Sequence, residues 1–402
     1  MRRRSLLLAC ALLPPLLPPL LPPLLAIAAL AAACGDDSSP AVPTTTDAAL
    51  DASAPEDAPP TPDGGVRPKG GRVLGVGMRI DDVLFPENVV AARDAGARSI
   101  NVTLAWDEVE RPFDGGVPDE DAGDAAPTQI FNASIHVANL VLDQDGMQGL
   151  VALPALDAFG SRAPAELQAR PLDDGELGAR YDKLTDYVLR SFPDAVVSAI
   201  LVGSDVDVAL GDDAAKHAAF ATFVGRAAAH VHAVAPKVKV GFTVTSDGVE
   251  ARASRFAAAW ASSDLVGVTV LPIDAAARVR SPGEIAAVFD RIVRAAPPGK
   301  PIVVHEAGFP TAVACGSDEA TQAAFVSAVF ASWDRHADRI PVLAFRELLD
   351  SDDDVVRARA ARAARADAPF LAFLGSLGLL ASDGRGKQGW SAFSRATKAR
   401  SF

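Results

Sequence analysis

The sequence predicts an α/β protein in which residues 71–402 fold as a single (β/α)8 TIM barrel, preceded by a signal peptide and a disordered linker. Short β-branched runs alternate with alanine-rich amphipathic stretches, which is the pattern of βα units around a parallel sheet. Eight such runs follow one another at intervals of about 25 to 50 residues, as a closed barrel requires. An open doubly wound sheet is disfavoured because no glycine-rich phosphate turn follows the first run.

Residues 1–33 are predicted to be a lipoprotein signal peptide. Three arginines precede a long apolar stretch that ends in small residues directly before Cys34. This ending resembles the lipobox of bacterial lipoproteins, which implies lipidation at Cys34, export, and anchoring to the envelope on its periplasmic or outer-surface face. A transmembrane anchor is the alternative. It is disfavoured because repeated Pro-Pro pairs remove backbone donors and kink a helix.

Residues 34–70 are predicted to form a disordered, acidic tether that begins at the lipidated Cys34. The stretch is rich in Pro, Ala, Thr, Ser and Asp and has almost no large apolar side chains. It therefore cannot bury enough apolar surface to order itself, and we expect a semi-extended spacer.

Charge and cysteine content limit the partners and the chemistry of the domain. The net charge of −13 disfavours nucleic acid as a partner. Of three cysteines, Cys10 belongs to the signal peptide and Cys34 is the lipidation site, which leaves Cys315 without a disulfide partner. The domain is therefore expected to depend on its hydrophobic core for stability.

The predicted strands and helices alternate along residues 71–402. The eight strands are Arg72–Met78, Arg98–Leu104, Gly149–Leu153, Val196–Val202, Val238–Val244, Leu265–Val270, Ile302–Val304 and Pro341–Phe345. The helices between them are Glu87–Ala95, Ala133–Leu142, Glu176–Arg190, Ala214–Val234, Ala251–Ala261, Gly283–Ala295 and Glu319–His336. Two stretches are candidates for the final helix: residues 355–365, which read as an exposed arginine-rich helix, and Gln388–Lys398.

The run Lys300–Pro310 carries a carboxylate to the end of the seventh predicted strand. Glu306 follows β-branched residues, and Gly308 and Pro310 then turn the chain away. Enzymes with a (β/α)8 barrel place their chemistry at this end of the strands. The structural alternative is a strand end whose glutamate is merely solvated. His305 is expected to point away from Glu306 because side chains alternate along a strand.

Asp205 and Asp207 follow the fourth predicted strand, so a second carboxylate reaches the same end of the barrel. Cleavage of a glycosidic bond with retention needs two carboxyl groups about 5–5.5 Å apart, one to protonate the leaving oxygen and one to attack. Both aspartates face the same side in an extended chain, so the sequence does not choose between them. A polar strand end bonded to the loop backbone is the structural alternative for both.

Three segments resemble clan A glycoside hydrolases. Lys300–Pro310 resembles the nucleophile segment of β-1,3-glucanase-like members, in which Glu precedes a small residue, Gly, an aromatic residue and Pro. Residues Gly378–Trp390 resemble the Gly-Leu, Asp-Gly, Lys and Trp ending of such barrels. Trp106 and Glu110 resemble the Trp and Glu-Pro segment that follows the second strand.

The resemblance covers most of residues 71–402 and implies hydrolysis or transfer of a β-glycosidic bond with retention. It implies Glu306 as the nucleophile and Asp205 as the acid/base, a carbohydrate or cell-envelope glycan as the partner, and no cofactor.

The chain departs from the family pattern at several positions. The family ends its fourth strand with Asn-Glu, where this chain has Ser204-Asp205. Aspartate is one methylene shorter, and a displacement of about 1 Å can cost about a hundredfold in rate. Leu271-Pro272 stands where these families often place a tyrosine, and the chain has 2 Tyr and 4 Trp in all. These departures favour the alternative function, a catalytically inactive barrel that binds glycan or serves as a structural envelope lipoprotein.

Further residues near predicted strand ends are expected to bind substrate. They are Arg79, Trp106, Asp157, Ser204 and Asp207. The acidic run at residues 350–354 is expected to be a solvated loop, since no calcium-loop pattern accompanies it. The six histidines do not cluster, so no metal site is predicted.

Overall fold

The computed structural model describes residues 66–67, 69–112, 128–130 and 132–402. These residues fall within one structural unit, Thr61–Phe402. The predicted signal peptide, the predicted lipidation site Cys34 and most of the predicted tether lie outside the described residues. No helix among the described residues is both long enough and apolar enough to cross a membrane.

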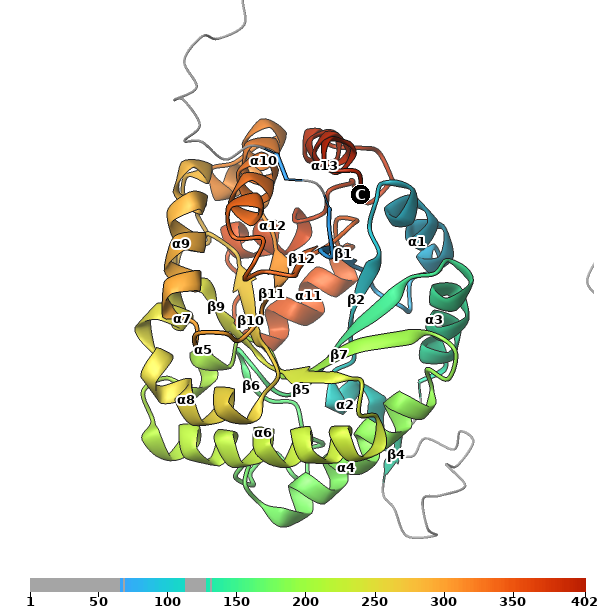
Figure 1. The fold of residues 1–402 in the computed structure, drawn as a ribbon, viewed down its shortest axis with the longest axis vertical. Helices are drawn as coiled ribbons and strands as arrows, with labels where there is room; N and C mark the ends of the chain where they lie inside the picture. Colours follow the sequence, from blue (N-terminus) through green and yellow to red (C-terminus); the bar gives the residue numbers. More distant parts are fainter. Residues whose placement is uncertain (1–65, 68, 113–127, 131) are drawn as a thin grey trace, which may run out of the picture. The chain divides into compact units, whose positions relative to one another are not determined.

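The strands close into a parallel barrel, which confirms the predicted (β/α)8 fold (Figure 1). The hydrogen-bonded order is β8-β7-β5-β2-β1-β12-β11-β10-β9. Only Phe242 separates β8 from β9, so these two short strands are halves of the fifth barrel strand, and the sheet joins end to end. The barrel strands are β1 (Val73–Gly77), β2 (Ser99–Thr103), β5 (Gln148–Asp157), β7 (Val196–Gly203), β8 (Lys239–Gly241), β9 (Thr243–Thr245), β10 (Val266–Val270), β11 (Ile302–Ala307) and β12 (Val342–Phe345).

Helices follow the strands and surround the barrel (Figure 1). They are α1 (Phe85–Asp94), α3 (Ala133–Gln144), α4 (Gly175–Arg190), α6 (Ala214–Val234), α7 (Ser246–Ala251), α8 (Ala253–Ser262), α9 (Ile285–Ala295), α10 (Glu319–Arg335), α11 (Asp353–Arg362), α12 (Ala368–Gly375) and α13 (Gln388–Ala399). Asp174, Asp213 and Asp318 precede α4, α6 and α10 and accept hydrogen bonds from backbone N–H groups of the first turn, which fixes where each helix begins. Both candidates for the final helix are helical, as α11 and α13.

Short elements complete the connections between barrel strands. They are α2 (Trp106–Val109), α5 (Val206–Leu210), the antiparallel pair β3 (Glu110–Pro112) and β4 (Thr128–Ile130), β6 (Gly160–Ser161) beside β5, and two 3-10 turns at Pro282–Glu284 and Val313–Cys315.

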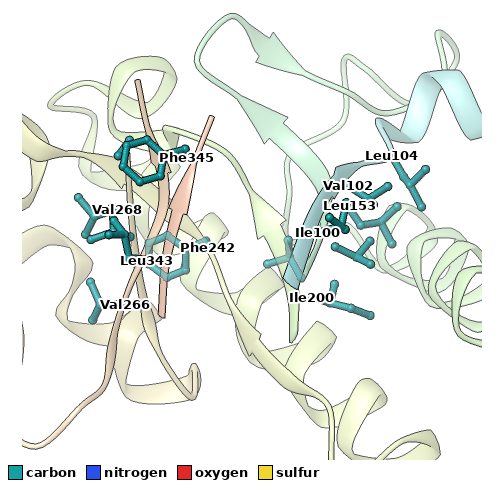
Figure 2. Packing of buried hydrophobic residues seen from close by; sticks show 14 of the residues in the cluster. Ile100, Val102, Leu104, Leu153, Ile200, Phe242, Val266, Val268, Leu343 and Phe345 are labelled. Atoms are coloured by element: carbon teal, nitrogen blue, oxygen red, sulfur yellow. The ribbon is translucent and has the colours of Figure 1, made fainter. Parts of the chain in front are cut away.

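Alternation along the strands divides the apolar residues into two layers. On β7, Ile200 and Val202 belong to the large layer between strands and helices, whereas Leu201 belongs to a small cluster with its neighbours inside the barrel. Figure 2 shows part of the large layer, with side chains of β2, β5 and β7 on one side and of β10 and β12 on the other. The inner cluster consists of Leu150, Ala152, Ala199, Leu201, Leu265 and Val303. Side chains therefore fill the barrel interior, as in other closed barrels of this size.

The Gly378–Trp390 segment holds the loop after β12 in place. Lys387 is 3% exposed, and its Nζ lies 2.6 Å from Oδ1 of Asp350. The backbone N–H of Gly378 donates to the same oxygen at 2.9 Å, and a Cβ on Gly378 would lie 2.2 Å from the backbone nitrogen of Asp350. Asp350 is thus part of a buried contact, contrary to the expectation of a fully solvated acidic loop.

A buried ion-pair network joins the two ends of the described domain. Asp334 on α10 accepts from Arg72 at 2.8 Å and from Arg400 at 2.6 Å, and all three side chains are at most 7% exposed. The guanidinium of Arg72 also lies 4.4 Å from the centre of the Trp333 ring. Arg72 precedes β1 and Arg400 follows α13, so Asp334 ties the first strand and the last helix to α10.

We expect Asp334→Asn to lower the free energy of unfolding by about 3 kcal/mol or more, because it leaves two buried guanidinium groups without their counter-charge. Urea titration followed by circular dichroism measures this change. Asp338→Asn is the control: Asp338 is 91% exposed and pairs with Arg67 at 3.6 Å, so we expect less than about 0.5 kcal/mol. Equal losses in the two variants would contradict the assigned role of Asp334.

Candidate active site

The C-terminal ends of the barrel strands open into a cavity of about 820 Å³. Five of the residues predicted from the sequence line it: Arg79, Asp157, Ser204, Asp205 and Glu306. The structure therefore brings the two principal carboxylates to one mouth. Trp106 and Asp207 do not line the cavity.

A β-bulge directs Glu306 into the cavity. In the pairing of β10 with β11, Val304 lies opposite Val268 and Glu306 lies opposite Thr269, so His305 is an extra residue on β11. The pairing of β11 with β12 shifts in the same place. As a result His305 and Glu306 both line the cavity, although strict alternation puts them on opposite faces. The expectation that His305 points away from Glu306 is wrong for this reason.

Arg346, at the end of β12, forms an ion pair with Glu306. Its Nη1 lies beside Oε2 of Glu306, and both side chains are 19% exposed. Two glycines leave room for this arginine. A Cβ on Gly77 would lie 1.9 Å from the carbonyl oxygen of Arg346, and a Cβ on Gly308 would lie 3.2 Å from the Cβ of Arg346. Only glycine at Gly77 lets the backbone of β12 approach β1 this closely.

The ion pair determines the charge of Glu306. Burial by itself raises the pKa of this carboxyl, but the positive charge of Arg346, with smaller contributions from His305 and Arg359, outweighs burial and holds the pKa below its ordinary value. Burial lowers the pKa of His305, so this imidazole favours the neutral form. Glu306 is thus an anion at neutral pH.

Asp205 has the opposite electrostatic environment. Burial and the neighbouring negative charge of Glu306 raise its pKa to about 7, although the Thr269 side chain lowers it in part. The backbone of Asp205 is left-handed, with φ 49° and ψ 41°, at the sharp turn between β7 and α5. Its N–H donates to Oγ1 of Thr243 at 2.8 Å, which helps to fix this turn.

Two carboxyl groups at one mouth therefore have different charges. Near neutral pH a large fraction of Asp205 carries a proton, while Glu306 is ionised. Environments that push two pKa values apart are how a site assigns the roles of acid and base. The arrangement can donate a proton from one side chain and offer an anionic oxygen from the other.

Asp207 and Trp106 are buried, and each is hydrogen-bonded to another residue of the protein. Asp207 is 2% exposed, and its two carboxylate oxygens accept from the backbone N–H and the hydroxyl of Thr245, each at 2.7 Å. A Cβ on Gly248 would lie 2.1 Å from the same carboxylate, so Asp207 anchors the start of α7. Trp106 is fully buried and donates from Nε1 to Glu110 at 2.6 Å.

The remaining predicted residues lie on the rim, where charged neighbours hold them. Arg79 donates to both oxygens of Asp81, at 3.0 and 2.7 Å. Asp157, at the end of β5, accepts from Arg162 at 3.2 Å and from Arg362 at 3.0 and 3.1 Å. Of the described residues that line the cavity, Phe159 is the only Phe, Tyr or Trp.

Sequence reasoning missed several residues of the cavity. Arg346 directly follows a predicted strand, so its position at a strand end was a usable signal. His305 depends on a bulge that no pattern in the sequence marks. Arg359 and Arg362 line the cavity from α11, although the arginine-rich stretch was predicted to be exposed. Among the described residues, no three His, Cys, Asp or Glu side chains are grouped so that they could hold a metal ion.

No protein-family model matches this chain, and no curated protein matches it. Solved glycoside hydrolases nevertheless share its fold. A psychrophilic family 10 endo-β-1,4-xylanase is 13% identical with a TM-score of 0.55, over 81% of this chain and 97% of that one. A family 1 β-glucosidase from Thermotoga maritima is 11% identical with a TM-score of 0.55, over 82% and 98%.

A third similar structure is an active-site mutant of the Rhizomucor miehei β-1,3-glucanosyltransferase in complex with laminaritriose. It is 13% identical with a TM-score of 0.51, over 79% of this chain and 96% of that one. The chain thus shares the TIM-barrel fold of these solved glycoside hydrolases.

We expect Asp205→Asn to stabilise the protein increasingly as the pH rises from about 4 to about 7. The unfolded chain releases the Asp205 proton near its ordinary pKa, whereas the folded protein keeps it until about pH 7, so the wild type loses stability in this window. The advantage of the variant at pH 8 is expected to be about 1–3 kcal/mol.

Urea unfolding at pH 4.5, 6 and 8 measures this difference, and Asp338→Asn serves as the exposed control. A difference between Asp205→Asn and wild type that stays constant over the three pH values would contradict the raised pKa.

Proposed function

We propose that this chain is a retaining glycoside hydrolase or transglycosidase that acts on a β-glycosidic bond, with Glu306 as the nucleophile and Asp205 as the acid/base. The observation that carries the proposal is the presence, at one barrel mouth, of one carboxyl group that retains its proton and one that is ionised. The glycoside hydrolase fold supports it, because the C-terminal ends of the strands hold the catalytic groups of enzymes with this barrel.

The proposed reaction uses both carboxyl groups twice. Asp205 gives its proton to the glycosidic oxygen while an oxygen of Glu306 attacks the anomeric carbon, so the bond to the leaving group breaks and a glycosyl ester forms. Asp205, now ionised, takes a proton from water or from an acceptor sugar hydroxyl. That oxygen attacks the anomeric carbon and releases Glu306, which completes hydrolysis or transfer.

The arrangement around Asp205 fits this cycle. When Glu306 becomes an ester it loses its negative charge, so the repulsion that raises the pKa of Asp205 disappears at the step in which Asp205 must act as a base. In the ester intermediate, Arg346 faces an uncharged group. As the ester bond breaks, Glu306 becomes negatively charged again and attracts Arg346 fully, which favours departure of the sugar.

The proposed substrate is a carbohydrate, such as a cell-envelope glycan. One of the similar structures holds laminaritriose, which supports a β-linked glycan as the ligand class. Ser204, Asp157 and Arg79 line the cavity and offer hydrogen-bonding groups for sugar hydroxyls.

Glycan binding without turnover is the second candidate function. The ion pair with Arg346 occupies an oxygen of the proposed nucleophile, and Phe159 is the only Phe, Tyr or Trp on the described cavity wall. A carboxylate that is held in this way is a weaker nucleophile than a free one. The two candidates differ in whether a covalent intermediate forms.

We expect a fluorinated glycosyl fluoride to label the wild-type protein at Glu306 and to leave Glu306→Gln unlabelled. The rate of labelling should fall above about pH 7, because the proton on Asp205 is lost there. Mass spectrometry of intact protein and of peptides measures both. Glu347→Gln is the matched control, since Glu347 also contacts Arg346, at 3.7 Å. We expect this variant protein to be labelled at Glu306 as the wild type is. Laminaritriose binding without any labelling would favour the second candidate.

We also propose that the protein is exported and anchored to the bacterial envelope through a lipid on Cys34. The basic and apolar residues before this cysteine and the acidic, Pro-rich residues after it support an anchor followed by a spacer. In this arrangement the barrel reaches glycan at a distance from the membrane.

We expect Cys34→Ser to abolish incorporation of labelled palmitate and to move the protein out of the membrane fraction. Cys10→Ser is the control and should retain both the label and the membrane location. Labelling that survives in Cys34→Ser and is lost in Cys10→Ser would reassign the anchor.

A further inference from the structure

One face of α11 forms part of the cavity wall. Val355, Ala358, Arg359 and Arg362 line the cavity, and their spacing of three, one and three residues places them along a single stripe of the helix. In Figure 1, α11 crosses the view within the ring of strands. The helix therefore lies beside the same opening that holds Glu306 and Asp205.

Ion pairs attach this face of α11 to the rim of the barrel. Arg362 donates to both oxygens of Asp157 at 3.0 and 3.1 Å and lies 3.7 Å from Asp107. Arg359 contacts Glu347 and donates to the hydroxyl of Ser351 at 3.0 Å. We call these contacts of Arg359 and Arg362 the clasp. Asp157 ends β5 and α11 follows β12, so the Arg362 contacts of the clasp join distant sectors of the mouth, whereas those of Arg359 hold α11 to the segment that directly follows β12.

The apolar attachment of α11 is small and separate from the main core. The helix buries two side chains, Val356 and Ala360. Both belong to a cluster with α12 and nearby loops that is distinct from the large core. The other members of this cluster are Ala277, Cys315, Phe370, Phe373, Leu374 and Leu377. Elements that bury few apolar groups open at low free-energy cost.

The clasp also connects to the proposed nucleophile through alternating charges. Arg359 contacts Glu347, Glu347 lies 3.7 Å from Nε of Arg346, and Arg346 pairs with Glu306. Removal of Arg359 from Glu347 leaves that carboxylate free to attract Arg346. A shift of Arg346 toward Glu347 would expose an oxygen of Glu306.

We infer that α11 is a lid that the clasp holds closed over the cavity, and that its opening admits glycan and loosens the hold of Arg346 on Glu306. This inference deepens the proposed function and rests on it for the role of Glu306. Closure limits the access of solvent to the two carboxyl groups, and opening gives the site access to an extended chain. Because ion pairs hold the lid, its opening depends on salt.

Hydrogen exchange of the backbone amides of α11 tests the lid without any need for catalysis. We expect exchange in α11 to quicken at least about fivefold between about 0.05 M and 1 M NaCl, while the barrel strands stay unchanged, because salt screens partly exposed pairs. Arg362→Met should produce the same local effect at low salt. Arg357→Met is the control on the same helix: Arg357 is 67% exposed and pairs only with Asp354 among the described residues.

Labelling of Glu306 by the glycosyl fluoride gives the second readout. We expect Arg362→Met, but not Arg357→Met, to be labelled several times faster than wild type. If the chain is not a glycosidase, labelling is absent in every variant and the exchange result still decides whether α11 is a lid. Unchanged exchange in α11 both at high salt and in Arg362→Met would overturn the inference. So would an equal loss of protection across the whole barrel, since the clasp would then support the fold and not a lid.

Discussion

The site depends on one partly buried ion pair, that of Glu306 with Arg346. A carboxylate taken out of water loses its hydration, and it stays charged only if a cation or several donors replace that hydration. Arg346 supplies the replacement, so the pKa of Glu306 lies below its ordinary value although burial by itself raises it. The resulting negative charge then acts on Asp205, whose proton it helps to retain. One contact thus holds Glu306 in its charged form and, together with burial, keeps the proton on Asp205.

The barrel makes this contact possible, although regular alternation along β11 would point the Glu306 side chain away from the cavity. The bulge at His305 turns Glu306 inward, and Gly77 and Gly308 leave space for the arginine on the neighbouring strand. Below these residues the apolar cluster around Leu201 closes the barrel interior, so the charged groups occupy only its open end. The domain can tolerate such polar burial because its large apolar layer and the Asp334 network stabilise the rest of the fold.

The sequence predicted the barrel well because apolar alternation and βα spacing are local signals that tertiary packing reinforces. It also predicted that Glu306 and Asp205 reach the same end of the barrel, where both line the cavity, since each follows a β-branched run and strand ends converge at one mouth. It did not separate Asp205 from Asp207, because a period of two gives both the same face. The left-handed turn at Asp205 breaks that period and leaves Asp207 to bond with Thr245. The burial of Trp106 was not predicted for a related reason: a strand-end position does not show whether a short helix turns the ring inward, where its Nε1 donates to Glu110.

The left-handed backbone at Asp205 has a consequence for any redesign of this site. Aspartate is among the few residues with a side chain that enter this region readily, and glutamate is not. The shorter acid is therefore matched to its turn, so aspartate at this position suits the backbone as well as the proposed chemistry. Replacement of Asp205 by glutamate would introduce conformational strain. An engineer who wants the longer reach must first rebuild the loop that joins β7 to α5.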